Sequence, residues 1–260
     1  MSWLNLKDRV CVVTGAGGGI GRATALDLAR EGAALALIDL DEARCADVLK
    51  EVRSLGARAE VFAADISDQA QVEHTAERCR EALGACDVLV NVPAISGRPD
   101  PLMSVAIEKW NRHIEVNING YLHCSRAFGR QMIAQGRGSI VNVGSIAGEL
   151  PQPESGAYSV TKAGVSMLSR GLALELGKNG VRSNVVSPAM IRTPLSERLY
   201  SNPDVARRRG EFVPLGRVGV AQDISNTILF LASDRSGYVT GQTLLVDGGV
   251  SLVLMGLFPK

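Results

Sequence analysis

Short apolar runs alternate with amphipathic stretches along most of this chain. The apolar runs are bounded by charged residues or glycines, a pattern typical of strands that are buried on both faces. We expect strands at residues 10–13, 33–38, 58–64, 87–90, 139–143, 182–186 and 243–246. Helical spacing predicts helices at residues 19–31, about 41–55, about 67–83 with Ser67 as the cap, about 107–134, from Tyr158 to near Gly177, and 221–232.

Strands that alternate with helices predict the α/β fold class, with a parallel sheet covered on both sides. Right-handed crossovers then give a doubly wound sheet of about seven strands. No internal repeat or low-complexity linker divides the chain, so we expect one domain over residues 1–260. Residues 188–215 have a mixed, proline-marked composition that indicates a mobile segment, and we expect a substrate lid at about 189–215.

Composition adds mainly exclusions. Hydrophobic residues make up 46% of the 260 and charged residues 21%, which permits a sizeable core. A net charge of +1 gives no electrostatic reason to expect nucleic acid or an anionic membrane as a partner. The five cysteines form no Cys-x-x-Cys pair, and none has a histidine at metal-ligand spacing, so we expect reduced thiols and no metal site. Without a leader or an apolar run of 18 residues, the chain is expected to be cytoplasmic.

The first expected strand leads into a glycine-rich turn. Gly15, Gly19, Ile20 and Gly21 follow Thr14 in the order Gly-x-x-x-Gly-Ile-Gly, although the literal G-x-G-x-x-G pattern is not present. Glycines permit a tight turn and bring backbone N–H groups against a pyrophosphate at a helix N-terminus. A strand–turn–helix unit of this kind predicts a dinucleotide-binding site.

An acidic residue supports that prediction. Asp39 lies 20 residues beyond Gly19 at the end of the second strand, where a carboxylate can accept hydrogen bonds from an adenosine ribose. Because it would also repel a 2′-phosphate, we expect NAD(H) rather than NADP(H) as the cofactor. Arg22 and Arg44 stay open as phosphate partners, and Asp39 as a helix cap is the simpler alternative.

The stretch from Ser139 to Val165 carries the candidate chemistry. It begins as a buried strand, passes through a loop with Ser145 and enters a helix with Tyr158 and Lys162. Positions four apart lie on one face of a helix, so the phenol and the ammonium point the same way. A nearby cation favours the phenolate and lowers the pKa of a tyrosine from its usual value of about 10 toward that of an acid/base catalyst. An ordinary helix with one aromatic contact and one solvated lysine is the alternative for this pair alone.

With these features in order, the sequence resembles the classical short-chain dehydrogenase/reductase family over nearly its whole length. Ser145 precedes Tyr158 by 13 residues, a separation familiar in that family. The matching positions are Thr14-Gly15-x-x-x-Gly19-Ile20-Gly21, Asp65, Asn91, Asn117, Ser145, Tyr158-x-x-x-Lys162, and Ser187-Pro188 leading to Thr193-Pro194.

The resemblance implies a catalytic set of Asn117, Ser145, Tyr158 and Lys162. Tyr158 would be the general acid in ketone reduction and the base in alcohol oxidation. Lys162 would lower the pKa of Tyr158 and hold the nicotinamide ribose, Ser145 would bind the substrate oxygen, and Asn117 would position a water. The further cofactor-binding residues that it implies, beside the glycine turn and Asp39, are Asp65 and Ile66 at the adenine, Asn91, and Pro188, Ile191 and Thr193 toward the carboxamide.

Two segments depart from the family pattern. The chain has Asn91-Val92-Pro93-Ala94 where the family usually shows Asn-Asn-Ala-Gly, and Pro188-Ala189 where Pro-Gly is common. The first change removes an amide and a backbone donor and adds a methyl beside the expected cofactor. Both changes bear on cofactor affinity and local geometry more than on the type of reaction.

The substrate is expected to be a small secondary alcohol or ketone with a hydrophobic body. The candidate substrate-binding residues, besides Ser145 and Tyr158, are Leu150, Gln152, Met190, Leu195 and Leu199. Packing of the lid on the domain is an equal alternative for the apolar ones. Arg207, Arg208 and Arg209 fit either an acidic substrate tail or a solvated helix face.

Three functions stay open at this stage. The first is an NAD-dependent alcohol dehydrogenase or ketone reductase, and the second is a 3-oxoacyl-carrier-protein reductase, which Asp39 disfavours. The third is a dinucleotide-binding paralogue without turnover. The apolar tail at residues 250–258 is too short to span a membrane, and its burial against a neighbouring subunit is consistent with the homotetramers common in the family.

Overall fold

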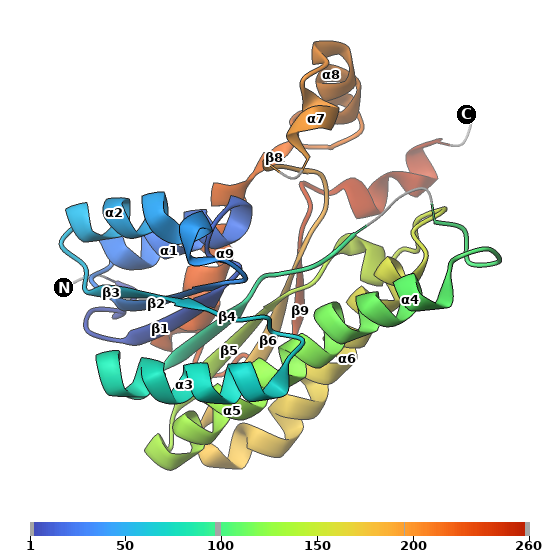
Figure 1. Ribbon diagram of the computed structural model, residues 1–260. Coiled ribbons are helices and arrows are strands. Elements are labelled where there is room, and N and C mark those ends of the chain that lie inside the picture. Colours follow the sequence, from blue (N-terminus) through green and yellow to red (C-terminus); the bar gives the residue numbers. More distant parts are fainter. Residues whose placement is uncertain (1–2, 97–99, 195, 258–260) are drawn as a thin grey trace.

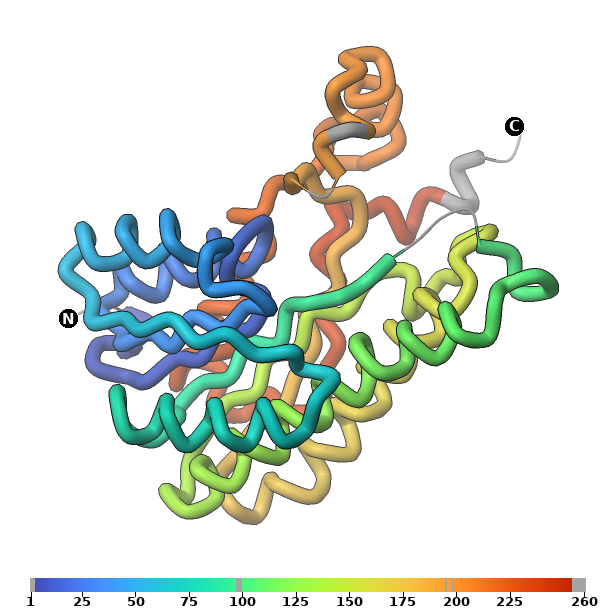
Figure 2. Tube along the Cα trace, in the orientation of Figure 1, coloured from blue at the N-terminus to red at the C-terminus, as the bar shows by residue number. Residues whose placement is uncertain are grey.

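The centre of the molecule is a seven-stranded sheet in which every pair of neighbours is parallel (Figure 1). The computed structural model describes residues 3–96, 100–194 and 196–257 (Figure 2). Its strand order, β3-β2-β1-β4-β5-β6-β9, is that of a doubly wound sheet and confirms the predicted fold class. The strands are β1 Val10–Thr14, β2 Ala34–Asp39, β3 Ala59–Ala63, β4 Val88–Asn91, β5 Gly138–Val143, β6 Val181–Pro188 and β9 Thr243–Val246.

Helices cover both faces of the sheet, as Figure 1 shows. One face carries α1 (Gly19–Arg30), α2 (Ala46–Ser54) and α9 (Ala221–Ala232). The other carries α3 (Gln69–Leu83), α5 (Gly120–Gln135) and α6 (Ala157–Leu176). Each face therefore has its own apolar core, and successive residues of a strand contribute to opposite cores: Val13 packs in one and Val12 in the other.

The helix expected at about residues 107–134 is continuous but not uniform. It runs as α4 (Ile107–Ile114), a π-helical turn at Glu115–Asn119 and then α5. Such π-turns occur often at functional sites because they re-aim side chains that a regular helix would direct elsewhere. Asn117 lies within this turn.

The cap predicted for α3 is wrong by one residue. Asp68, not Ser67, accepts hydrogen bonds from the backbone N–H groups of Ala70 and Gln71. The hydroxyl of Ser67 is engaged elsewhere, because it donates to the carboxylate of Asp65 at 2.6 Å. This local hydrogen bond competes with capping, and Asp68 takes the cap position instead.

The expected lid at about 189–215 contains short regular elements that project from the sheet (Figure 1). They are β7 Ile191–Arg192, which pairs with β8 Gly219–Val220, and the helices α7 Glu197–Tyr200 and α8 Pro203–Glu211. The C-terminal tail forms a 3-10 helix at Val250–Leu257, and residue 258 of the expected tail lies outside the described part of the chain. No helix among the described residues is both long and apolar enough to cross a membrane.

Candidate active site

A cavity of about 650 Å³ opens at the carboxyl ends of the strands. Doubly wound folds bind ligands at this edge, in the crevice beside the point where the strand order reverses. Twelve of the predicted residues line it together. They are Gly15, Gly19, Ile20, Asp39, Asp65, Ile66, Ser145, Tyr158, Lys162, Pro188, Ile191 and Thr193.

The glycine turn provides the cradle at one end of this cavity. Gly15 and Gly19 have φ angles of +66° and +52°, which favour glycine. Gly21 is required by space, because a methyl group there would collide with the carbonyl oxygen of Gly15. At the start of α1, Gly18 supplies no side-chain cap, and no acidic residue stands in the first turn. The N-terminal N–H groups of α1 are thus suited to the pyrophosphate of a dinucleotide.

Asp39 closes the turn at the end of β2, with only 5% of its surface exposed. Its carboxylate accepts hydrogen bonds from the backbone N–H of Gly17 at 3.0 Å and of Leu40 at 2.9 Å, and forms an ion pair with Arg44 at 2.7 Å. The helix-cap alternative is wrong, because Asp41 caps the following 3-10 turn through the N–H of Ala43. Asp39 is available to a ligand at the cavity wall, with a cation directly beside it.

Asp65 and Ile66 form the wall expected at the adenine. Burial raises the pKa of Asp65, but hydrogen bonds from Ser67 and Arg112 outweigh this effect and hold the pKa below its usual range. Arg112 also lines the cavity, 3.2 Å from the Asp65 carboxylate. The sequence prediction missed Arg112. This residue lies 47 positions after Asp65, and α4 brings the two together, which no spacing pattern reveals.

Ser145, Tyr158 and Lys162 meet on the other side of the cavity. The α6 helix begins at Ala157, so Tyr158 and Lys162 lie one turn apart, with the Lys162 ammonium 5.9 Å from the centroid of the Tyr158 ring. Ser145 is fixed at the start of a short 3-10 turn, where its hydroxyl accepts the backbone N–H of Ala147 at 3.1 Å. The three side chains come from two segments of the chain and face one space.

Lys162 is almost fully buried, with 1% of its surface exposed. Its Nζ donates to the carbonyl oxygen of Val143 at 2.7 Å, and Tyr121 donates to the same oxygen at 3.1 Å. Burial lowers the pKa of Lys162 to about 7. Within the described residues, no carboxylate forms an ion pair with this ammonium, so its charge is directed to whatever enters the cavity beside Tyr158.

Asn117 is fully buried and does not line the cavity. Its side-chain amide makes two hydrogen bonds with the backbone of Ile95, accepting the N–H at 2.9 Å and donating to the carbonyl at 3.0 Å, and it also donates to Thr161 at 3.1 Å. In this structure Asn117 therefore anchors the loop after β4. A water-positioning role for it stays a prediction.

That loop is the segment that departs from the family pattern. Val92, Pro93 and Ala94 all line the cavity, and Pro93 packs closely against Gly15. Asn91 is buried beneath it and donates to Asn142 at 2.9 Å, away from the cavity. The unusual residues thus shape the cavity wall itself, beside the glycine turn.

The structure does not bring most of the predicted substrate-binding residues to this cavity. Leu150 and Leu199 are 48% and 41% exposed, and neither lines it. Gln152 lies outside it as well, and Met190 lines a separate cavity of about 190 Å³ behind the lid. Leu195 lies outside the described residues. The lid residues are displaced because α7 and α8 project away from the sheet edge (Figure 1).

Comparison with known proteins agrees with this geometry. A family model described as enoyl-(acyl carrier protein) reductase matches residues 15–251. The 3-oxoacyl-[acyl-carrier-protein] reductase FabG of Thermotoga maritima is 37% identical over 248 residues, which cover 95% of this chain and 99% of that protein. The chain belongs to the classical short-chain dehydrogenase/reductase family. It is an oxidoreductase of that family, and the predicted family is confirmed.

Solved structures of short-chain dehydrogenases show the same fold with either dinucleotide. NAD⁺-bound xylitol dehydrogenase has a TM-score of 0.89 and 31% identity, over 94% of this chain and all of that one. A gluconate 5-dehydrogenase from Burkholderia cenocepacia, solved with NADP and tartrate, has a TM-score of 0.88 and 33% identity, over 94% of this chain and 96% of that one. The chain therefore belongs to a dinucleotide-binding family whose solved members include one with NAD⁺ and one with NADP, and the glycine turn fits such a group.

Proposed function

We propose that this protein is an NAD(H)-dependent oxidoreductase that interconverts a secondary alcohol and a ketone. The observation that carries the proposal is that the glycine turn and the Ser145–Tyr158–Lys162 set line one cavity. A dinucleotide held by the turn at one end would reach the catalytic side chains at the other. The bound nicotinamide supplies or accepts the hydride.

The protein side chains supply the proton and the electrostatics. Tyr158 donates its proton to the carbonyl oxygen in reduction and takes it back in oxidation. Ser145 donates a hydrogen bond to the same oxygen as negative charge develops on it. Lys162 stabilises the phenolate of Tyr158, because a buried ammonium without a carboxylate partner interacts strongly with a nearby anion.

The choice of NAD(H) rests on Asp39. A carboxylate at the end of β2 accepts hydrogen bonds from ribose hydroxyls and repels a 2′-phosphate. Arg44 is the opposing feature, since its guanidinium lies against Asp39 and could turn to a phosphate. The ratio of kcat/KM for NADH to that for NADPH tests the choice. We expect this ratio to be at least about ten, and a preference for NADPH would overturn the choice.

A 3-oxoacyl-carrier-protein reductase is the second candidate, and the similarity to the Thermotoga maritima enzyme over its whole length favours it. Of the three arginines in α8, Arg207 pairs with Glu211 and Arg209 donates to Tyr200. Arg208 is left as the cation that an acidic carrier-protein tail would meet.

An NADH absorbance assay separates the two candidates. It compares acetoacetyl-CoA and acetoacetyl-carrier protein with cyclic and linear ketones as substrates. Absence of turnover with all of them would favour the non-catalytic paralogue.

We also propose a cytoplasmic homotetramer. Val160, Met167 and Leu174 repeat every seven residues along α6 and are 45%, 64% and 86% exposed, which forms an apolar stripe suited to a second copy. All five cysteines are buried and free, in keeping with a reducing compartment. Light scattering at micromolar concentration should give a tetramer, and Met167→Glu with Leu174→Glu should dissociate it; a monomeric parent protein would contradict the proposal.

A further inference from the structure

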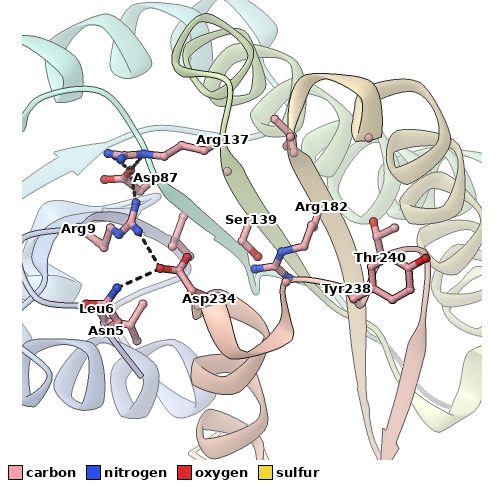
Figure 3. A pocket seen from close by; sticks show the side chains of 17 residues that line it. Asn5, Leu6, Arg9, Asp87, Arg137, Ser139, Arg182, Asp234, Tyr238 and Thr240 are labelled. Carbon is pink, nitrogen blue, oxygen red and sulfur yellow. Dashed lines mark hydrogen bonds and ion pairs between the residues drawn. The ribbon is translucent and has the colours of Figure 1, made fainter. Parts of the chain in front are cut away.

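A second cavity, of about 540 Å³, lies at the opposite end of the sheet (Figure 3). It is lined by residues that precede or begin β1, β4, β5 and β6, whereas the dinucleotide cavity follows the ends of the strands. The two cavities share no lining residue. The size of the second falls in the range of about 300–1,000 Å³ usual for small-molecule sites.

One side of this cavity is a closed network of ion pairs. Asp87 accepts hydrogen bonds from the backbone N–H of Val10 at 3.0 Å, from Arg9 at 3.3 Å and from Arg137 at 3.0 Å. Arg9 also donates to Asp234 at 3.0 Å (Figure 3). Each carboxylate in the cavity wall is therefore already paired with a guanidinium.

The other side holds a guanidinium that lacks such a partner. Arg182, half-buried on β6, donates to Ser236 at 2.9 Å, to the carbonyl of Ser233 at 3.1 Å and to the carbonyl of Val239 at 3.5 Å. All three acceptors are neutral, and no carboxylate of the described residues lies within ion-pair distance of it. Burial lowers the pKa of Arg182 and the charge of Asp234 raises it, but a guanidinium stays protonated in proteins.

The cavity consequently carries an excess of positive charge. Three arginines (Arg9, Arg137 and Arg182) face two aspartates (Asp87 and Asp234). Two of the three hydrogen bonds of Arg182 use Nη1 and one uses Nη2, so Nε–H and one Nη2–H have no acceptor among the described residues. Its guanidinium is held in place by β6 and the loop before β9, so little conformational entropy remains to be lost on binding.

A hydroxyl donor lies in the same cavity. Thr240 lines it, and its Oγ1 accepts the backbone N–H of Ser183 at 3.1 Å, so the hydroxyl proton can still be donated. Figure 3 shows Thr240 beside Tyr238, and the Arg182 guanidinium directed toward Ser139 and Asp234. The Tyr238 side chain is fully exposed, and it can pack over a ligand that enters from solvent.

We propose that this cavity is a binding site for a small organic oxyanion, with a carboxylate or phosphoryl group held by Arg182 and Thr240. Arginine suits both groups because its planar fork donates two parallel hydrogen bonds to a pair of oxygens. The space permits a ligand larger than inorganic phosphate. The site is independent of the proposed reaction, since it stands at the far ends of β4, β5 and β6.

Titration calorimetry of the NADH-saturated protein at fixed ionic strength tests the proposal. The probes are malonate and citrate for the carboxylate class, inorganic phosphate and phosphoenolpyruvate for the phosphoryl class, and chloride as the blank. We expect one saturable site per chain for at least one class. Heats no larger than those of chloride for all four probes would overturn the proposal, and so would competition with NADH.

Variants of the cavity locate the binding. We expect Arg182→Gln to weaken it at least about tenfold and Thr240→Val to weaken it severalfold, because each removes donors to the oxyanion. Arg130→Gln is the matched control: this arginine is 56% exposed on its side chain, pairs with Glu73 and does not line the cavity. Thermal melting shows whether each variant folds. If Arg182→Gln does not fold, the affinity of Thr240→Val for the oxyanion decides the question. An unchanged affinity in the folded variant would show that the oxyanion binds at another site.

Discussion

The two ends of the sheet are built by different physics. At the carboxyl end, close backbone contacts and buried side chains form the cavity: a glycine turn without a capping side chain, an apolar wall at Val92–Ala94 and one buried ammonium, Lys162. At the amino end, a network of ion pairs lines the cavity, with Arg182 beside it. Both cavities contain ion pairs, Asp39 with Arg44 and Asp65 with Arg112 at the carboxyl end, and both contain one cation without a carboxylate partner among the described residues. The difference is that Lys162 is almost fully buried beside Tyr158, whereas Arg182 is half-buried among neutral acceptors.

The difference explains where chemistry can occur. In the proposed reaction, the Lys162 charge would act at short range on Tyr158 and on a reacting oxygen, because its burial removes the water that would screen it. In the amino-end cavity, carboxylates already neutralise most of the cations, which suits reversible binding of an ion rather than proton transfer. Variants of backbone contacts, of charged residues at the cavity wall and of the buried ammonium should therefore change different properties: NADH affinity, cofactor preference and stability.

The largest effect on binding and stability is expected at the glycine turn, where backbone contact builds the proposed cofactor cradle. Gly21→Ala places a methyl against the carbonyl of Gly15, so the turn must shift, at a cost of about 1–3 kcal/mol. We expect the Kd for NADH, measured by fluorescence, to rise about 10- to 100-fold.

Gly171→Ala is the matched control for that change. Its added methyl would meet no atom within 4 Å, and it lies on α6 away from the cavity. The Kd for NADH should not change, because the added methyl lies far from the glycine turn. Equal losses of NADH affinity in both variants would contradict a specific role for Gly21.

An effect of similar size, on cofactor preference rather than on binding itself, is expected at Asp39. Asp39→Ser removes the negative charge and frees Arg44 for a 2′-phosphate. The ratio of kcat/KM for NADPH to that for NADH should increase by about 10- to 100-fold, which corresponds to about 1.4–2.7 kcal/mol. Asp41→Ser alters the neighbouring acid and can retain its cap, so it should leave the ratio unchanged. A similar shift in both variants would point to general electrostatics instead.

The smallest effect is expected in stability, at the buried ammonium. Lys162→Met should raise the free energy of unfolding at pH 6 by about 1 kcal/mol, or roughly 2–4 °C in Tm, since methionine needs no desolvation of a charge. Tyr121 still satisfies the Val143 carbonyl in this variant.

The gain should depend on pH in a defined direction. The pKa of Lys162 is about 7 in the folded protein, whereas the ordinary pKa of a lysine, which applies to the unfolded chain, is 10.5. Between pH 7 and pH 10.5 the unfolded parent protein binds more protons at this position than the folded one does. The free energy of unfolding of the parent protein therefore rises with pH in this range. The advantage of Lys162→Met should therefore be largest below pH 7 and shrink toward pH 10, as measured by thermal melts. A variant that is less stable at pH 6 would show that the burial cost has been misjudged.

The sequence could place the glycine turn, Asp39 and Ser145 together because each follows the end of an apolar run, and parallel strands bring such positions to one edge. Tyr158 and Lys162 were identified in another way, by their spacing on one face of a helix and by the family resemblance. Strand positions were accurate because runs of buried residues on both faces are easily recognised.

Positions set by tertiary packing could not be predicted in this way. Arg112 comes to the cavity from α4, 47 positions along the chain from its partner Asp65, and Asn117 lies in a π-turn whose altered hydrogen bonds no periodicity shows. The lid residue Met190 has an apolar side chain like many others, and only the orientation of the lid decides that it lines a different cavity. The amino-end cavity was not predicted because its charged residues are far apart in the sequence and form no motif.

The proton-transfer role of Tyr158 is tested most directly by one comparison of the parent protein with Tyr158→Phe. The measurement is NADH-dependent turnover of the best ketone from the substrate screen, together with the Kd for NADH of the same samples. We predict that kcat falls by about 10²–10⁴-fold, the usual contribution of a general acid, while the Kd changes by less than about threefold. A Tyr158→Phe variant that retains kcat within tenfold of the parent protein would contradict the account, because the proton would then come from another group.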